Sequence, residues 1–197
     1  MTNSKLPNLE YESLYPGKII AGLDEVGRGA LSGPVVVAAV VVDSTFIIQG
    51  IKDSKKLSIA SRELLYDKIT SRYIWSVGLV SHEEIDRINI LEATKKACII
   101  AASNLATIPD IVLVDGNMKF ADTRFISIIN GDNLSISIAA ASIVAKVTRD
   151  RLMIKYSDDF PQYLWDKNFG YGTKQHIDAI KDNGLSSYHR KSFRIKN

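Results

Sequence analysis

Acidic residues stand at the ends of three apolar, strand-like segments of the chain. Asp24 and Glu25 follow the segment KIIAGL, Asp115 follows DIVLV, and Asp132 stands in the turn sequence NGD. One aspartate beside a glycine is typical of turn chemistry, and three such sites leave turn chemistry and convergence on one pocket equally open. Converging carboxylates repel one another, and a divalent cation removes that conflict. Oxygen ligands without a Cys or His cluster favour Mg²⁺ or Mn²⁺ over zinc.

Glu25 poses a geometric problem for a shared ion. Neighbouring residues on a regular strand point to opposite faces, so Asp24 and Glu25 cannot both reach one ion by side chain alone. Either the strand breaks at Glu25, or Glu25 contributes through its backbone carbonyl or through water. We expect the break, because Gly27 and Gly29 follow immediately.

The sequence GRGALSG at residues 27–33 is a glycine-rich turn. It is not a dinucleotide-binding motif, because its third glycine is one residue late for GxGxxG and the apolar run that follows predicts a strand. The chain contains no GxxxxGK[ST] phosphate loop. A glycine turn that carries Arg28 beside two acids can instead bring backbone N–H groups and a guanidinium against a phosphate.

Hydrophobic periodicity predicts the elements that must position these residues. Strands are expected at 18–23, 35–42, 73–80, 110–114 and 125–129. Helices are expected at 58–70, 90–105, 135–156 and 174–182, with Leu64 and Ile154 among the residues that face inward. This order favours an α/β fold, a mixed sheet flanked by helices. We divide the chain into an irregular lead-in at 1–17, a catalytic core at 18–157 and a helical, basic segment at 158–197.

Composition indicates a globular chain without a membrane span. Its 197 residues are 46% hydrophobic and 24% charged, which suits one domain and argues against disorder. The longest apolar run, residues 35–42, is far shorter than the ~20 residues of a membrane helix, and the N-terminus lacks the apolar core of a secretory signal. The single cysteine, Cys98, excludes an internal disulfide and fits a reducing compartment. We expect a cytoplasmic monomer.

Positive charge gathers toward the C-terminus. The net charge is +3, and residues 146–197 hold eleven Lys and Arg against six Asp and Glu. Such a tail is typical of a solvated end, and Lys55, Lys146 and Arg149 are, taken singly, typical of solvent-facing cations. The tail gains importance if an acidic centre needs a polyanion delivered to it. Cys98 falls within an apolar helix, which favours a structural thiol over a nucleophile.

Six blocks of the sequence together resemble one family. The blocks LDEVGRGALSGPVVVAAVVV, DSKKLS, VDGN, GDNLSISIAAASIVAKVTRDRLM, GYGTKQH and HRKSF stand in the order and spacing of the motifs of bacterial ribonuclease HII. The resemblance covers about residues 18–195. Related type-three enzymes carry a long extra N-terminal domain and a lysine between the glycines, whereas this chain has a short lead-in and Arg28. Ala30 stands where the family often has proline, and Met118-Lys119 follow VDGN where the family commonly has arginine. Neither departure changes the acids.

The resemblance implies a ribonuclease H-like sheet and a metal-dependent endonuclease. Such an enzyme hydrolyses the RNA strand of RNA–DNA hybrids and nicks duplex DNA on the 5′ side of an embedded ribonucleotide, leaving 3′-hydroxyl and 5′-phosphate ends. Two Mn²⁺ or Mg²⁺ ions ~4 Å apart would perform the hydrolysis. By motif, the metal-binding acids are Asp24, Glu25, Asp115 and Asp132.

The resemblance also implies which residues hold the substrate. It places Gly27, Arg28 and Gly29 against the 2′-OH and the flanking phosphates, and Tyr171 against the sugar at the RNA–DNA junction. The 2′-OH is what lets a protein tell RNA from DNA at a given site. Further substrate contacts are expected from Lys55, Ser142, Lys146, Arg149, His189 and Arg190.

Two other kinds of function stay open at this point. A metal-dependent nuclease or phosphotransferase of another kind would keep the acids yet ignore the 2′-OH, and cleavage of an all-DNA duplex would reveal it. A non-enzymatic nucleic-acid binder would explain the basic tail but not the acids at strand ends. Cleavage assays with and without Mg²⁺ separate a metal-dependent enzyme from a non-enzymatic binder.

Overall fold

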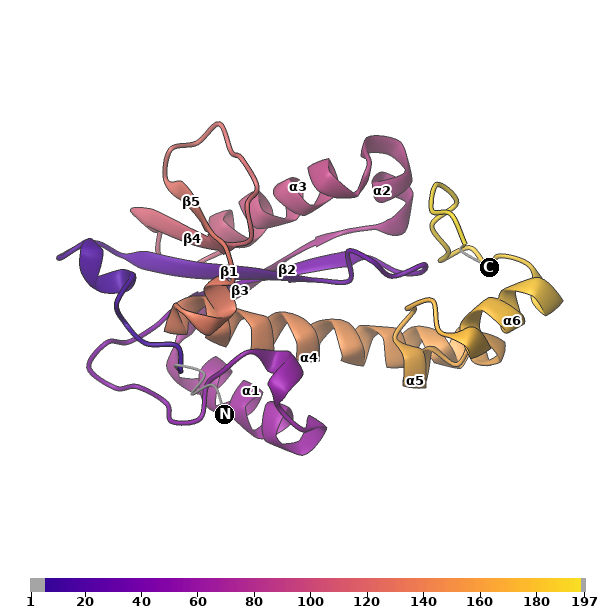
Figure 1. Ribbon diagram of the computed structural model, residues 1–197, viewed down its shortest axis with the longest axis horizontal. Coiled ribbons are helices and arrows are strands. Elements are labelled where there is room, and N and C mark those ends of the chain that lie inside the picture. Colours follow the sequence, from indigo (N-terminus) through magenta and orange to yellow (C-terminus); the bar gives the residue numbers. More distant parts are fainter. Residues whose placement is uncertain (1–5, 196–197) are drawn as a thin grey trace.

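A five-stranded mixed sheet forms the centre of the computed structural model, which describes residues 6–195 (Figure 1). Its strands are β1 (Ile20–Val26), β2 (Val35–Val41), β3 (Ile74–Val80), β4 (Ile111–Asp115) and β5 (Phe125–Ile128). Their order in the sheet is β3-β2-β1-β4-β5. β1, β4 and β5 run parallel, whereas β2 is antiparallel to both of its neighbours. The carboxyl ends of the three parallel strands therefore meet at one edge of the sheet.

Helices cover both faces of this sheet. The α-helices are α1 (Ile59–Arg72), α2 (His82–Ile88), α3 (Ile90–Ser103), α4 (Ile136–Asp159), α5 (Trp165–Asn168) and α6 (Lys174–Asn183). Single 3₁₀ turns form η1 (Glu12–Leu14), η2 (Ser54–Lys56), η3 (Gly131–Asn133) and η4 (Pro161–Tyr163). In Figure 1, α2 and α3 lie above the sheet and α4 lies below it, with α1 packed on the outer side of α4. The expected α/β architecture is confirmed.

Small residues let α4 approach the sheet closely. The alanines of the sequence IAAASIVA are buried where the helix crosses β1 and β2. Gly22 is the matching position on β1, because a Cβ there would lie 2.2 Å from the backbone carbon of Ser137. The close approach of α4 and β1 fixes the distance between the helix and the end of the strand.

Apolar side chains fill the spaces on both sides of the sheet. All residues of β2 are apolar, and its side chains alternate between the α3 side and the α4 side. Two of the side chains expected to face inward do not: Leu64 is 57% exposed and Ile154 is 46% exposed. Each lies at the border of its helix's apolar stripe, where periodicity alone does not decide between core and solvent.

Capping residues in the sequence mark where helices begin, but one helix has no signal in the sequence. Ser58, Ser81, Ser135 and Thr173 each accept a hydrogen bond from a backbone N–H in the first turn of the helix that follows. The short helix α2 is absent from the sequence-based expectations. Only Ile85 of its seven residues is buried, so it has no apolar periodicity to detect.

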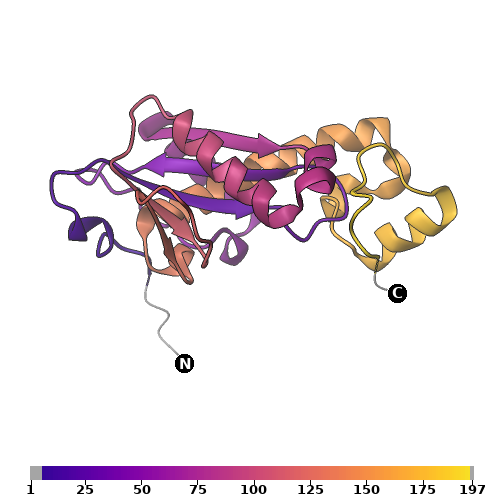
Figure 2. The ribbon, with the colours of Figure 1, turned by 90° about the horizontal axis from the view of Figure 1, so that it is seen from above.

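The C-terminal part of the chain lies beyond the end of the sheet. α4 continues past the sheet and carries α5 and α6, and the loop that follows α6 returns toward the end of β1 (Figures 1 and 2). Buried aromatic side chains, Tyr163 and Trp165 among them, pack this part around Met153 of α4. Of the expected lead-in and terminal segment, residues 1–5 and 196–197 lie outside the described residues. No helix within residues 6–195 is long and apolar enough to cross a membrane.

Candidate active site

The four predicted acids come from the shared edge of the three parallel strands. Asp24 lies near the end of β1, Asp115 is the last residue of β4, and Asp132 lies in η3, just after β5. Asp115 Oδ1 accepts a hydrogen bond from the backbone N–H of Gly131 at 2.7 Å, which ties the ends of β4 and β5 together. The acids therefore gather at one edge of the sheet, and only Asp24 and Glu25 among them line the pocket described below.

Burial and mutual repulsion shape the electrostatics of this acidic cluster. Burial raises the pKa of Asp24 well above its ordinary value, and the charges of Glu25 and Asp115 raise it further. Burial also raises the pKa of Asp132, again with a contribution from Asp115. These carboxylates therefore bind protons, or a cation, more readily than isolated carboxylates do.

Lys55 supplies a positive charge beside the acidic cluster. Burial lowers its pKa, but Asp24, Asp53 and Asp132 raise it more, so the net pKa lies above the ordinary value. The turn that carries Lys55 is fixed locally, because Asp53 accepts a hydrogen bond from the Lys55 backbone N–H at 2.9 Å. Asp53 is itself buried and contributes charge to the cluster. The sequence reading did not single it out, although it stands in the DSKKLS block.

The expected break of β1 at Glu25 is wrong. β1 continues through Glu25 and Val26, which pair with Val37 and Val36 of β2. Regular pairing keeps Asp24 on the α4 side of the sheet and Glu25 on the α3 side. The Glu25 carboxylate accepts a hydrogen bond from Arg28 Nη1 at 3.2 Å. Burial raises the Glu25 pKa, and the Arg28 charge opposes that rise.

A pocket of about 300 Å³ opens beside Asp24 and Glu25. Its other lining residues include four that the sequence singled out, Lys55, Ser142, Lys146 and Tyr171. Ser142 and Lys146 already have firm partners, and Tyr171 is bonded to the glycine turn described below. Ser142 Oγ accepts from the Ser54 N–H at 3.2 Å and donates to the Ala139 carbonyl at 2.8 Å.

Lys146 is the second lining residue with firm partners. Its ammonium donates to Asp150 Oδ1 at 2.8 Å and lies 4.6 Å from the centre of the Phe169 ring. The side chain is 20% exposed, so it is not the freely solvated cation that its sequence position suggests. The ammonium has three N–H donors, so it can contact another anion while it keeps its bond to Asp150.

The glycine turn, residues 27–33, continues directly from β1. Gly27 has a positive φ of 90°, and a Cβ there would lie 2.2 Å from Nε of Arg149. Gly29 differs, because nothing lies within 4 Å of the position where its Cβ would be. Arg28 and Gly29 are exposed, and neither backbone N–H has a partner among residues 6–195. The exposed tip of the turn is thus open to a ligand.

Segments from the C-terminal part hold the glycine turn on both sides. Ala30 forms a bridge with Tyr171, and Ser32 forms one with His189. The Leu31 N–H donates to the Gly170 carbonyl at 2.7 Å. Tyr171 adds a side-chain link, since its hydroxyl accepts from the Gly27 N–H at 3.2 Å. The turn and Tyr171 are therefore one structural unit.

Three predicted substrate contacts are buried beneath this unit. Arg149, His189 and Arg190 are 0%, 1% and 2% exposed. The interpretation of Arg149 as a solvent-facing cation is wrong, because loops far along the chain fold over it. In this structure the two guanidinium groups donate to backbone carbonyls.

His189 belongs to a buried histidine pair that includes a residue the sequence reading missed. His176 Nδ1 lies 2.9 Å from the Tyr171 carbonyl, so this nitrogen carries the proton. Its Nε2 then accepts from Trp165 Nε1 at 3.0 Å and from His189 Nε2 at 3.1 Å. Burial lowers the pKa of both histidines, that of His189 to about 4. The GYGTKQH and HRKSF blocks carry these residues, but nothing in their spacing shows that they meet.

The acid cluster fits divalent cations in charge and in donor type. Carboxylate oxygens are the ligands that Mg²⁺ and Mn²⁺ prefer, and the raised pKa of Asp24 marks a place where a cation relieves repulsion. Within residues 6–195, no three Asp, Glu, His or Cys side chains already stand in a ready ligand arrangement. Side chains at the ends of β1, β4 and β5 must therefore reorient to share an ion.

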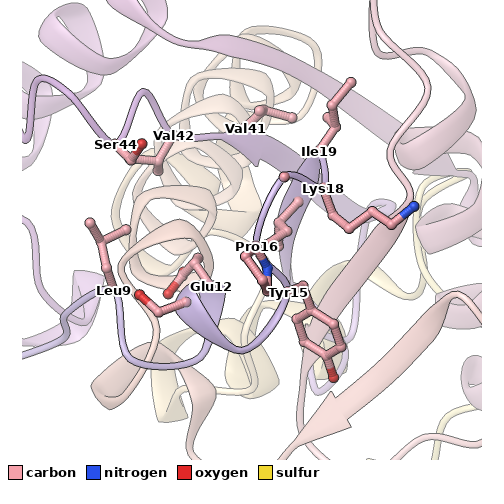
Figure 3. A pocket seen from close by; sticks show the side chains of 12 residues that line it. Leu9, Glu12, Tyr15, Pro16, Lys18, Ile19, Val41, Val42 and Ser44 are labelled. Carbon is pink, nitrogen blue, oxygen red and sulfur yellow. The ribbon is translucent and has the colours of Figure 1, made fainter.

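A second cavity, of about 370 Å³, lies at the opposite end of β1 (Figure 3). Backbone and mostly apolar side chains line it, Leu9, Ile19 and Val42 among them. Its one acid, Glu12, accepts from the Ser137 N–H and the Ser135 and Ser137 hydroxyls through Oε1. Glu12 thus caps the start of α4, and this cavity has no part in the acidic cluster.

Comparison with known proteins gives a consistent result. Residues 21–196 match the family described as Ribonuclease HII. A Ribonuclease HII of Rickettsia bellii is 71% identical over 185 residues, 94% of each chain. One of Rickettsia prowazekii is 67% identical over 186 residues, 94% of this chain and 96% of the relative.

Solved structures share the fold at lower identity. The RNase HII in a PCNA:RNase HII complex from Archaeoglobus fulgidus has a TM-score of 0.76 at 28% identity, covering 91% of this chain and 96% of that chain. A Bst-RNase HIII in complex with Mn²⁺ has a TM-score of 0.73 at 20% identity, covering 89% of this chain and 67% of that chain. The second comparison supports the fold alone.

Proposed function

Since the chain belongs to the ribonuclease HII family and is a metal-dependent nuclease of the ribonuclease H type, we propose that it cleaves the RNA strand of RNA–DNA hybrids and nicks duplex DNA on the 5′ side of an embedded ribonucleotide. The products are 3′-hydroxyl and 5′-phosphate ends. The observation that carries this proposal is that Tyr171 and Asp24 line one pocket, with the glycine turn bonded to Tyr171. A sugar-recognition unit and an acidic cluster therefore adjoin each other.

The acids are proposed to hold two Mn²⁺ or Mg²⁺ ions. Asp24, Asp115 and Asp132 supply carboxylates from the three parallel strand ends, and Glu25, on the opposite face of β1, contributes through its backbone carbonyl or through water. When bound, divalent cations activate water and stabilise the leaving 3′-oxygen in phosphodiester hydrolysis. Lys55 adds a positive charge that draws the scissile phosphate toward the acids.

The glycine turn is proposed to read the ribose. The free N–H groups of Arg28 and Gly29 can donate to the 2′-OH and to a flanking phosphate, and the Arg28 guanidinium can bind a phosphate oxygen. Gly29 has no neighbour that demands a glycine, so its bare backbone is explained by close approach of the nucleic acid. Tyr171 offers its ring to the deoxyribose that follows.

The C-terminal segment 158–197 is proposed to complete the substrate-binding surface of the core at 18–157. It contributes Tyr171 and the flanks of the glycine turn. Lys146 and exposed cations near the chain end, Lys191 and Arg194, are proposed to contact phosphates. We further propose that the protein works as a monomer in the cytoplasm.

One cleavage assay tests the proposed function. The substrate is a DNA duplex with a single ribonucleotide, incubated with Mg²⁺, with Mn²⁺ or with a chelator, and the product ends are mapped. We expect one nick on the 5′ side of the ribonucleotide that depends on the cation, and no cut in the all-DNA duplex. Cleavage of the all-DNA duplex would assign the site to a nuclease that ignores the 2′-OH, and binding without cleavage would assign it to a nucleic-acid binder.

A further inference from the structure

Two arginines lie buried directly beneath the glycine turn without a negative partner. Arg149, on α4, is 0% exposed, and Arg190, in the loop after α6, is 2% exposed. Neither guanidinium forms an ion pair with any carboxylate among residues 6–195. Buried arginines usually have such a partner, because removing a charge from water is costly.

Arg149 joins two stretches of backbone, through three carbonyls, with one guanidinium. Its Nε donates to the Pro34 carbonyl at 3.0 Å and its Nη2 to the Ser32 carbonyl at 3.0 Å. Its Nη1 donates to the Phe169 carbonyl at 2.8 Å, two residues before Tyr171. One side chain therefore fixes the end of the glycine turn relative to the loop that carries Tyr171.

Arg190 donates hydrogen bonds to two other carbonyls of the same turn. Its Nε donates to the Gly33 carbonyl at 2.9 Å and its Nη1 to the Arg28 carbonyl at 3.0 Å. Its Nη2 is buried and has no hydrogen-bond partner among the described residues. The two arginines, called here the arginine clamp, thus hold both ends of the glycine turn.

The clamp costs more free energy of desolvation than neutral side chains at the same positions would. A buried guanidinium without a counter-charge carries a desolvation cost that a neutral side chain of similar volume avoids. Burial and the nearby charge of Arg149 lower the pKa of Arg190 to about 9, so Arg190 is still charged at neutral pH. Two positive charges without an ion-pair partner beneath an exposed turn favour the approach of an anion to that turn.

We propose that Arg149 and Arg190 are positioning residues for ribonucleotide recognition. They set the spacing between the glycine turn and Tyr171, and they give the turn the positive potential that attracts the phosphate beside the ribonucleotide. This inference rests on the proposed function, because it assumes that the glycine turn holds a ribonucleotide. It assigns the two buried arginines a role through backbone that touches substrate rather than direct contact.

Geometry and charge make separable contributions. A lysine at position 149 keeps the positive charge, but its single ammonium cannot match the planar fork that reaches three carbonyls. A glutamine at this position removes the charge as well. Arg149→Lys therefore tests geometry alone, and Arg149→Gln tests geometry and charge together.

The experiment measures kcat and KM on a DNA duplex with one ribonucleotide for both variants. Arg149→Gln is expected to lower kcat/KM about a hundredfold, the loss that a misplacement of about 1 Å produces at an active site. We expect Arg149→Lys to restore KM to near the wild-type value while kcat stays low. The matched control is Arg151→Gln, two residues along α4, because Arg151 is exposed and paired with Glu63 at the surface.

A second measurement does not depend on catalysis. Hydrogen exchange of the peptide that spans residues 27–34 is expected to rise in Arg149→Gln and in Arg190→Gln, while exchange in β3 stays at the wild-type level. Exchange that rises equally in both places shows general destabilisation and overturns the positioning role. Because Arg190 makes two carbonyl contacts to the turn, Arg190→Gln serves if Arg149→Gln does not fold.

The outcomes separate this inference from the proposed function. If the wild-type protein nicks the ribonucleotide-containing duplex and Arg149→Gln does so within about threefold of it, the clamp has no positioning role. If Arg149→Lys restores both kcat and KM, the clamp acts through its charge alone. If Arg149→Lys restores neither, the clamp makes no electrostatic contribution. If the wild-type protein does not cut this duplex, the proposed function fails, and the exchange measurement still decides whether the clamp fixes the turn.

Discussion

The hydroxyl oxygen of Tyr171 accepts a hydrogen bond from the backbone N–H of Gly27 at 3.2 Å, across 144 positions of the chain. The residue proposed to stack on the sugar thereby fixes the start of the turn proposed to hold the ribose 2′-OH. The ring and the hydroxyl of Tyr171 therefore have different tasks, one toward the substrate and one toward the protein.

This division of tasks predicts different effects for two substitutions of Tyr171. Tyr171→Ala removes the ring and is expected to lower cleavage at RNA–DNA junctions roughly tenfold more than cleavage inside an RNA run, since a stacked aromatic is worth about 1–3 kcal/mol. Tyr171→Phe keeps the ring and loses only the bond to Gly27, so it should weaken both cleavages equally and modestly. Equal losses on both substrates for Tyr171→Ala would make this tyrosine a packing residue.

The glycines of the turn are expected to respond in opposite ways to an added methyl group. Gly29→Ala has open space around its Cβ, so folding should be unchanged while KM for the ribonucleotide-containing duplex rises. Gly27→Ala forces a Cβ against Arg149 at a positive φ, so its melting temperature should fall. Thermal unfolding and kinetics of the two variants check this pair. A wild-type KM for Gly29→Ala would show that the substrate does not approach the tip of the turn closely.

Asp115→Asn is expected to abolish cleavage without unfolding the protein. Asparagine keeps an oxygen for the hydrogen bond from the Gly131 N–H but loses the charge that binds a cation. Turnover should fall more than about a hundredfold at saturating Mg²⁺, and the rise in melting temperature on adding Mg²⁺ should disappear. Asp122→Asn is the control, because Asp122 pairs with Arg124 at the surface. Activity near the wild-type level in Asp115→Asn would remove Asp115 from the ligand set.

The histidine pair predicts a loss of stability in mild acid. The folded-state pKa of His189, about 4, lies below the ordinary value of 6.5, and that of His176 is lowered as well. The unfolded chain therefore binds more protons as the pH falls from about 6.5 toward 4, and the free energy of unfolding decreases over that window. Protonated His176 would also direct an N–H at the Trp165 N–H.

Melting temperature against pH in a chelator checks this expectation. His176→Gln keeps an acceptor for Trp165 but does not titrate, so its melting temperature should fall less steeply with acid than that of the wild type. The raised pKa of Asp24 acts in the opposite direction in both proteins and cancels in the comparison. Parallel curves for the two proteins would show that the pair is not responsible.

Exposed cations near the chain end are expected to set the salt dependence of binding. Lys191→Ala and Arg194→Ala should each lower the slope of log K against log salt by roughly 0.9 on a B-like duplex. Lys68→Ala, on the exposed side of α1, should leave the slope unchanged. Unchanged slopes in all three variants would return Lys191 and Arg194 to the class of solvated surface charges.

Local patterns were enough to predict the strands that carry Asp24 and Asp115, but they left convergence of the acids and turn chemistry equally open. The apolar runs around Asp24 and Asp115 identify strands without reference to the rest of the chain, and parallel pairing then brings their ends together. Glu25 shows the limit of this reasoning. The glycines that follow it suggested an early end to β1, but pairing with β2 continues past Glu25.

Tertiary burial was beyond the reach of the sequence. Arg149 stands on a helix beside Lys146 and Arg151, so its position alone suggests a solvated side chain. It is buried because segments 20 and 117 positions away place their carbonyls around it. His176 escaped notice for the same reason, since its partners Trp165 and His189 meet only after the C-terminal part has folded.

The two bridges that flank the glycine turn also constrain how the protein is made. A chain leaves the ribosome amino end first, and the sheet residues through β5 emerge before α5 and α6. The turn cannot gain its second flank until His189 has emerged and paired with Ser32. A nascent chain therefore carries its acids long before it carries a finished turn.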